Sequence, residues 1–172
     1  MSVMDSRVEK ARAQARQMRT TNDILIPLLV AAIGLPLIGE IYLVTFEPAP
    51  WAAQLGAPLA VLSKLVSYAP ALAAAAAVIM LRPVFVEYEA GRFLSTKASA
   101  AFQRAGLWAL AAFFLKIFVS PFVVALLRGE AFNWQFDPLD IALMTFAISV
   151  LMIGGVLEAA AASLKAENDQ IV

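Results

Sequence analysis

Four charged side chains stand inside long apolar stretches of the chain, where an ionised group is least expected: Glu40, Lys64, Lys116 and Glu158. A charge within the hydrocarbon of a bilayer is energetically unfavourable. Such residues in membrane proteins pair with one another, face a polar cavity or mark the path of an ion or solute. The chemistry open to these four candidate site residues is therefore ion pairing, gating or contact with a charged solute.

Depth along the helices predicts a pair between Glu40 and Lys64. With a rise of about 1.5 Å per residue, each lies about 9 Å below the same end of its apolar stretch. The two stretches are joined by a short connection, which predicts adjacent, antiparallel helices. Such a pair would be a structural ion pair, two side chains that snorkel to the interface, or an outward-facing gate or solute contact.

Lys116 and Glu158 are harder to pair. Lys116 lies near the centre of its apolar stretch, and we expect no acid at the same depth. It therefore reaches Glu158, points into a polar cavity or is partly neutral, since desolvation disfavours the charged form. Glu158 lies about one and a half turns from the end of the last stretch, a position that favours solvation at the membrane interface.

The composition excludes several classes of chemistry. The chain has no cysteine and no histidine, so disulfide frameworks, thiol catalysis and histidine-dependent triads are excluded. It also lacks a glycine-rich phosphate loop and a metal-ligand cluster, so we expect no catalytic residues, no enzyme activity, no cofactor and no metal site. Basic and acidic residues number 13 each, and this balance predicts no direct binding of nucleic acid.

The elements that must position the charges are predicted to be membrane-spanning helices. Of the 172 residues, 62% are hydrophobic and 15% are charged, against about 45–50% and about 25% in soluble domains. A helix needs about 20 apolar residues to cross a bilayer. Four stretches qualify, at 24–46, 58–81, 106–127 and 141–164. We therefore expect an all-α integral membrane protein, a four-helix bundle that forms a single transmembrane domain over 23–165.

Local signals predict where these helices begin and end. Asp23 is expected to cap the first span, and the prolines of Glu47–Pro50 are expected to end it. Gly91 could close a short helix that follows the second span, and Ser95 could cap a helix that continues into the third. The Asp137-Pro138 pair predicts the start of the last helix.

The distribution of lysine and arginine predicts the orientation, since cytoplasmic segments of membrane proteins are rich in both. Residues 1–22 form a basic amphipathic arm, expected to lie on the anionic inner leaflet or, alternatively, to dock a soluble partner. Residues 166–172 form a tail. With four spans, the arm, the second connection and the tail share one side, so both termini are predicted to be cytoplasmic at a cell inner membrane. Ten basic residues lie on that side, against Arg128 alone on the other: Arg7, Lys10, Arg12, Arg16, Arg19, Arg82, Arg92, Lys97, Arg104 and Lys165.

Two segments carry a family resemblance. The second connection reads Tyr88-Glu89-Ala90-Gly91-Arg92-Phe93-Leu94-Ser95, and the chain ends in Leu164-Lys165-Ala166-Glu167-Asn168-Asp169-Gln170-Ile171-Val172. With the four spans, they resemble the bacterial membrane family catalogued as domain of unknown function 2975. One residue separates the phenylalanine and serine of the turn here, and Gln170 departs from the usual aliphatic or threonine residue. The resemblance assigns a cytoplasmic motif to five residues: Tyr88, Gly91, Arg92, Phe93 and Ser95.

Two classes of function remain open. The resemblance implies a bacterial membrane protein without established activity. It also implies a cytoplasmic regulator as partner, because some relatives are encoded beside small helix-turn-helix regulators. In the first class, the chain is a non-enzymatic multi-pass module that binds or regulates a partner through the arm, residues 83–104 and the tail; a homo-oligomer is also open. In the second, it is a small transporter or channel subunit that uses Glu40, Lys64 and Lys116. The off-centre glutamate and the one-sided charge favour the first.

Overall fold

The structure is a computed structural model that describes the backbone of residues 3–132 and 137–169, and the side chains of 8–132, 137–138 and 140–163. Across these residues the regular structure is entirely helical, as the sequence predicts. Four helices are long and apolar enough to cross a membrane. The elements are α1 (Val3–Phe46), α2 (Pro50–Leu55), α3 (Ala57–Glu89), α4 (Thr96–Phe114), the π-helical turn η1 (Leu115–Val119), α5 (Ser120–Arg128) and α6 (Pro138–Asp169).

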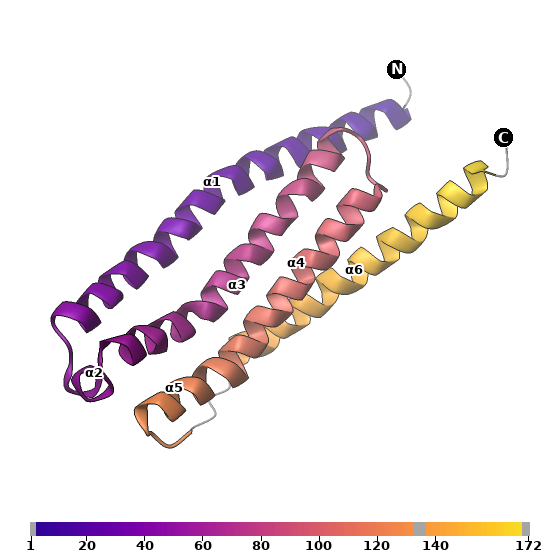
Figure 1. Cartoon of the computed structure of the whole chain (residues 1–172). Coiled ribbons are helices and arrows are strands. Elements are labelled where there is room, and N and C mark those ends of the chain that lie inside the picture. Colours follow the sequence, from indigo (N-terminus) through magenta and orange to yellow (C-terminus); the bar gives the residue numbers. More distant parts are fainter. Residues whose placement is uncertain (1–2, 133–136, 170–172) are drawn as a thin grey trace.

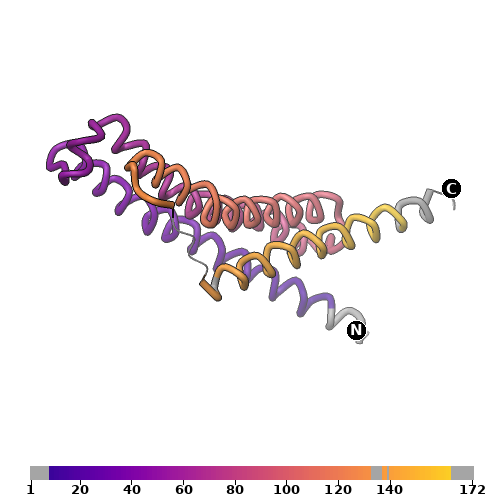
Figure 2. The backbone as a smooth tube through the Cα atoms, turned by 90° about the horizontal axis from the view of Figure 1, so that it is seen from below, coloured from indigo at the N-terminus to yellow at the C-terminus, as the bar shows by residue number. Residues whose placement is uncertain are grey.

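The long helices pack in the order in which they occur in the chain. Helix α3 lies between α1 and α4, and α4 in turn packs against α6 (Figure 1). The start of α1, the α3–α4 connection (Ala90–Ser95) and the end of α6 lie at one end of the bundle, which we call the basic end. Helices α2 and α5 lie at the opposite end, the α2–α5 end, as both views show (Figures 1 and 2).

Small residues allow α3, α4 and α6 to approach closely. Buried alanines of the three helices, Ala77, Ala109 and Ala147, form one cluster. A Cβ atom placed on Gly106 of α4 would lie 2.9 Å from the backbone nitrogen of Leu151 on α6. The helix crossing therefore depends on glycine and alanine, as is common where membrane helices meet without large side chains between them.

Helix α1 turns most of its apolar surface outward. Only 6% of its most apolar 18-residue window is buried in the described structure, and Leu35 and Ile38 are 70% and 66% exposed. A soluble monomer rarely leaves so continuous an apolar surface in water. The exposed surface is what a lipid-facing helix presents, and it agrees with the four-span assignment.

The prediction that Asp23 caps the first span is wrong. Helix α1 runs unbroken through this position, and the Asp23 carboxylate accepts a hydrogen bond from Nε of Arg82 at 2.6 Å. The sequence contains neither glycine nor proline from residue 4 to residue 26, so nothing interrupts the helix. The predicted arm thus has no helical boundary with the first span over the described residues.

The other helix ends follow the sequence signals more closely. Helix α1 ends at Phe46, directly before the proline-rich segment, and α6 begins at Pro138. The hydroxyl oxygen of Ser95 accepts a hydrogen bond from the backbone nitrogen of Ala98 at 3.1 Å, which is an N-cap of α4. The separate short helix expected after the second span is wrong, because α3 continues through Pro83 to Glu89.

The third span contains a π-helical turn that the sequence signals do not predict. Helices α4 and α5 continue into each other through η1, which precedes Pro121. Proline has no backbone N–H to donate, so the helix around it must rearrange its hydrogen bonds. Single π turns are often found at functional positions within helices, and this one carries Lys116.

Candidate functional site

The predicted pair between Glu40 and Lys64 is confirmed. Nζ of Lys64 lies 2.5 Å from Oε2 of Glu40, and the two residues join α1 to α3. One turn further along α3, the hydroxyl of Tyr68 donates a hydrogen bond to Oε1 of Glu40 at 3.3 Å. Both oxygens of the Glu40 carboxylate thus have a partner on α3.

An indole covers this pair at the α2–α5 end. The ring centroid of Trp51 lies 5.6 Å from Nζ of Lys64 and 4.3 Å from the guanidinium carbon of Arg128. Cations over an indole face are attracted by its quadrupole. A pocket of about 380 Å³, lined by Glu40, Glu47, Trp51 and Lys64 among others, opens beside the ring.

Lys116 pairs with Asp140 of α6 and not with Glu158. Its Nζ contacts Oδ1 of Asp140, so the expectation that no acid lies at its depth is wrong. Asp140 is 2% exposed, and its second oxygen accepts a hydrogen bond from the backbone nitrogen of Asp137 at 3.1 Å. Because α6 starts at Pro138, the first-turn residue Asp140 comes level with the middle of the third span. Sequence reasoning missed Asp140 as a site residue; its position in the first turn of a membrane helix was the available signal.

Glu158 does not meet Lys116. It is exposed on α6 and accepts a hydrogen bond from the side-chain amide of Gln103 on α4. The four intramembrane charges therefore do not converge on one site. They are distributed over three contacts, each of which joins two different helices.

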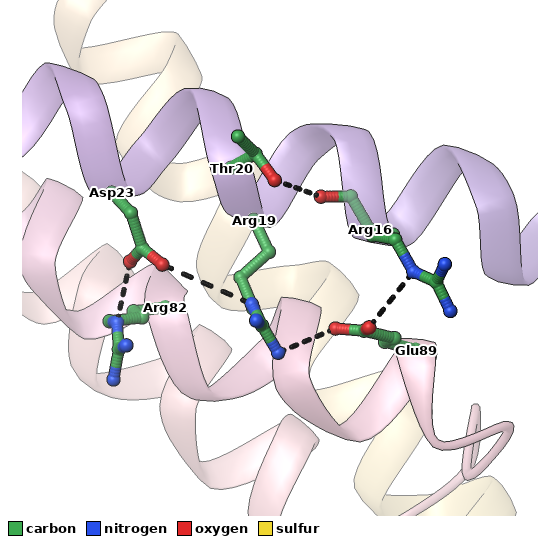
Figure 3. Close-up of polar contacts among 6 residues, drawn as sticks. All are labelled: Arg16, Arg19, Thr20, Asp23, Arg82 and Glu89. Carbon is green, nitrogen blue, oxygen red and sulfur yellow. Dashed lines mark hydrogen bonds and ion pairs between the residues drawn. The ribbon is translucent and has the colours of Figure 1, made fainter.

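At the basic end, charged side chains of α1 hold the last turns of α3 (Figure 3). The Glu89 carboxylate accepts hydrogen bonds from two arginines of α1, from Arg16 Nε at 3.1 Å and from Arg19 Nη1 at 2.6 Å. Two turns earlier on α3, Arg82 donates to Asp23 at 2.6 Å. Asp23 also lies 3.9 Å from Nε of Arg19, one turn back along α1. The predicted arm and the second connection are therefore joined by a row of alternating charges.

The α3–α4 connection is built as a closed turn. Arg92 donates two side-chain hydrogen bonds to Glu87, at 2.7 and 3.0 Å, and its backbone nitrogen donates to the Glu87 carbonyl at 2.9 Å. Glu87 is buried, whereas the side chain of Arg92 is 60% exposed. The carboxylate beside it raises the pKa of the Arg92 guanidinium above its ordinary value. Charge-assisted bidentate pairs of this kind fix geometry strongly.

Gly91 is required at the centre of this turn. Its φ is +78°, a conformation that L side chains rarely adopt. A Cβ atom here would also lie 2.5 Å from Nη2 of Arg12, so the guanidinium of α1 packs directly on the Gly91 backbone. This contact adds to those that α1 makes with Arg82 and Glu89 at the end of α3.

The structure brings the five motif residues together. The Tyr88 ring packs against Phe93, with centroids 5.4 Å apart, and Phe102 of α4 lies 6.5 Å from Tyr88. Gly91 and Arg92 form the turn, and Ser95 starts α4. The tail motif Leu164–Val172 lies outside the residues whose side chains are described.

Over the residues that the structure describes, no group of three or more Asp or Glu side chains is placed to hold a metal ion. Comparison of the chain with protein-family models, with curated proteins and with solved structures finds no match. What is established is a multi-pass, all-α protein with four helices suited to a membrane.

Proposed function

We propose that the protein is a non-enzymatic membrane module that binds a partner protein at its basic end, with that end in the cytoplasm and the spans in a bacterial inner membrane. The observation that carries the proposal is the double contact of Glu89 with Arg16 and Arg19. Because of it, the start of α1 and the α3–α4 connection form one preassembled surface. A surface that is ordered before binding loses less entropy when a partner docks.

The exposed charge of this surface favours an acidic partner. The side chains of Arg16, Arg82 and Arg92 are 73%, 53% and 60% exposed, although each already contacts a carboxylate of the chain. Arginine retains further N–H donors after one such contact, and its planar fork suits carboxylate groups. A cytoplasmic protein that presents aspartate or glutamate side chains would complete these hydrogen bonds.

The orientation is supported by the topology together with the charge count. The two ends of the described chain lie at the same end of the bundle, as an even number of crossings requires (Figure 1). The connection between α3 and α4 lies there as well. The arm, the second connection and the tail, which carry ten of the 13 basic residues, therefore share one side. The positive-inside rule assigns such a side to the cytoplasm.

The test is a photocrosslinking comparison in intact membranes. A photoreactive side chain replaces Leu94, which is 44% exposed in the turn, and a matched one replaces Ala49, exposed at the α2–α5 end. We expect a defined protein adduct from Leu94 and not from Ala49. The identified partner is then purified, and its binding to the full chain in nanodiscs is expected to weaken with Glu89→Gln and to be unchanged with Glu47→Gln.

Two results would overturn the proposal. One is an identical adduct pattern from both positions, since binding would then not be located at the basic end. The other is equal affinity of the Glu89→Gln variant and the parent chain. If the adduct from Leu94 joins two copies of this chain, the partner is a second copy and the protein is a homo-oligomer. The same variants then test the interface between the copies.

A small transporter or channel subunit is the second candidate, favoured by the pocket beside Glu40 and Lys64. It ranks second because Glu40 and Lys64 neutralise each other and Lys116 is held by Asp140. In proteoliposomes, this candidate requires solute or ion flux that Glu40→Gln abolishes. The partner-binding proposal expects the same flux from that variant and from the parent chain.

A further inference from the structure

A groove between α3 and α4 at the basic end combines an apolar floor with two cations. It has a volume of about 340 Å³ and is lined by Met80 and Pro83 of α3 and by Lys97, Ala101 and Arg104 of α4, among others. The alanine side chain is small, which leaves the floor open between the two helices. Neither Asp nor Glu belongs to the lining.

The two cations of the groove are available to a ligand. Lys97 and Arg104 are exposed, and neither forms an ion pair with any side chain that the structure describes. The carboxylate close to Lys97 is that of Glu87, which is engaged by both donors of Arg92. Most other arginines of the basic end are paired with a carboxylate, so this groove holds the unneutralised charge nearest to the spans.

Helix geometry places the two cations on the same face of α4. Lys97 and Arg104 are seven residues apart, so they lie on one face of α4, about 10 Å apart along its axis. Both side chains line the groove between α3 and α4. They are long and flexible, so one phosphate group bound between them could contact both cations.

The same face of α4 continues toward the membrane interior. Trp108 follows Arg104 by one turn and is 44% exposed. Exposed tryptophan is enriched at the level of the lipid headgroups. The position of Trp108 therefore favours a location of the neighbouring groove at the level of the lipid headgroups.

We propose that this groove binds an anionic phospholipid, with its phosphate between Lys97 and Arg104 and an acyl chain over Met80 and Ala101. Basic pockets between helices at a membrane surface are suited to anionic headgroups. A free phosphate ester would satisfy the cations, but it would leave the apolar floor in contact with water. The inference is independent of the proposed partner, because it concerns the face of α4 and not the turn.

The test is native mass spectrometry of the full chain in detergent, with added dioleoylphosphatidylglycerol or dioleoylphosphatidylcholine, which share the same acyl chains. The variants are Lys97→Gln/Arg104→Gln, and Arg7→Gln/Lys10→Gln as a control with the same loss of charge on the arm at the same end. Ala100→Leu narrows the groove without changing charge. Circular dichroism confirms the helical content of each variant.

We expect the parent chain to prefer the anionic lipid. Each basic residue contributes about fivefold to binding of an anionic lipid surface, so the Lys97/Arg104 variant should bind about 25-fold more weakly. The Arg7/Lys10 variant should bind as the parent does, and Ala100→Leu should weaken binding. The Ala100→Leu result decides the matter if the double variant does not fold.

Three results would overturn the inference. An equal loss in both double variants would mean that general surface charge attracts the lipid. Unchanged binding by Ala100→Leu would mean that the groove is not occupied. Displacement of the lipid by an equal concentration of glycerol 3-phosphate would identify a site for free phosphate esters rather than for a lipid.

Discussion

Arg19 of α1 donates a hydrogen bond to Glu89, the last residue of α3, with Nη1 and Oε2 2.6 Å apart. The first helix therefore extends beyond its apolar stretch and runs alongside the end of its neighbour α3. Arg16 binds the other oxygen of the same carboxylate at 3.1 Å (Figure 3). This arrangement makes the basic end a fixed assembly of two segments that are 70 residues apart in the chain.

Removal of these contacts should loosen the start of α1 without unfolding the spans. Exposed ion pairs contribute about 0.2–1 kcal/mol each, so the loss of two pairs in Arg16→Gln/Arg19→Gln should raise amide hydrogen exchange across residues 8–20 by up to about thirtyfold. Exchange in α4 should not change. Lys10→Gln is the control, because no ion pair of Lys10 occurs among the described side chains. Equal exchange in the parent and the double variant would show that the arm is not held by Glu89.

Gly91→Ala should destabilise the turn. A left-handed conformation is unfavourable for alanine by about 1–2 kcal/mol, and the new Cβ would press on the Arg12 guanidinium. Thermal unfolding in detergent followed by circular dichroism measures the loss. The double variant Arg12→Ala/Gly91→Ala relieves the contact but not the backbone strain, so it should remain less stable than Arg12→Ala. Equal stability of these two variants would contradict the left-handed turn.

Gly154→Ala and Gly155→Ala should differ, although the two residues are adjacent. A Cβ at Gly154 would lie 3.0 Å from the backbone nitrogen of Gln103, whereas a Cβ at Gly155 meets nothing within 4 Å. Overpacking of a close contact costs about 1–3 kcal/mol, so the first variant should unfold at lower temperature. The second should match or exceed the parent, since alanine favours helix over glycine by about 1 kcal/mol. The reverse order would mean that α6 is rotated from the position described.

Lys116→Met should destabilise the protein more than the double variant Lys116→Met/Asp140→Leu. Loss of one partner leaves Asp140 buried without a counter-charge, which costs about 3–5 kcal/mol. Replacement of both by apolar residues removes that penalty. Unfolding in a titration of denaturing detergent compares the three chains. If the double variant is the least stable, the two residues do not act as a pair.

The sequence predicts much of the fold because its strongest signals are local or directly set by the bilayer. Each span follows from an uninterrupted apolar stretch, and the Glu40–Lys64 pair follows from equal depth in consecutive helices. Proline and serine signals locate the end of α1 and the start of α4. These features need no knowledge of how distant segments pack.

The features that the sequence predicts wrongly, or does not predict, depend on tertiary contacts. Asp23 has the chemistry of an N-cap, but the helix before it is stabilised by contacts with α3, which override the local signal. Lys116 lacked a predicted partner because the depth of Asp140 depends on where α6 re-enters the bundle. The contact of Arg12 with Gly91 joins residues whose spacing in the chain predicts nothing.

The distance between the start of α1 and the α3–α4 connection tests the central claim most directly. The chain has no cysteine, so spin labels can be attached to Gln14→Cys and Leu94→Cys, both at exposed positions. Double electron–electron resonance in nanodiscs should give one narrow distance distribution, broadened by Glu89→Gln and unchanged by Glu47→Gln. A broad distance distribution in the chain with Glu89 intact would contradict a preassembled basic end. A distribution of the same width in the parent chain and in the Glu89→Gln variant would contradict it as well.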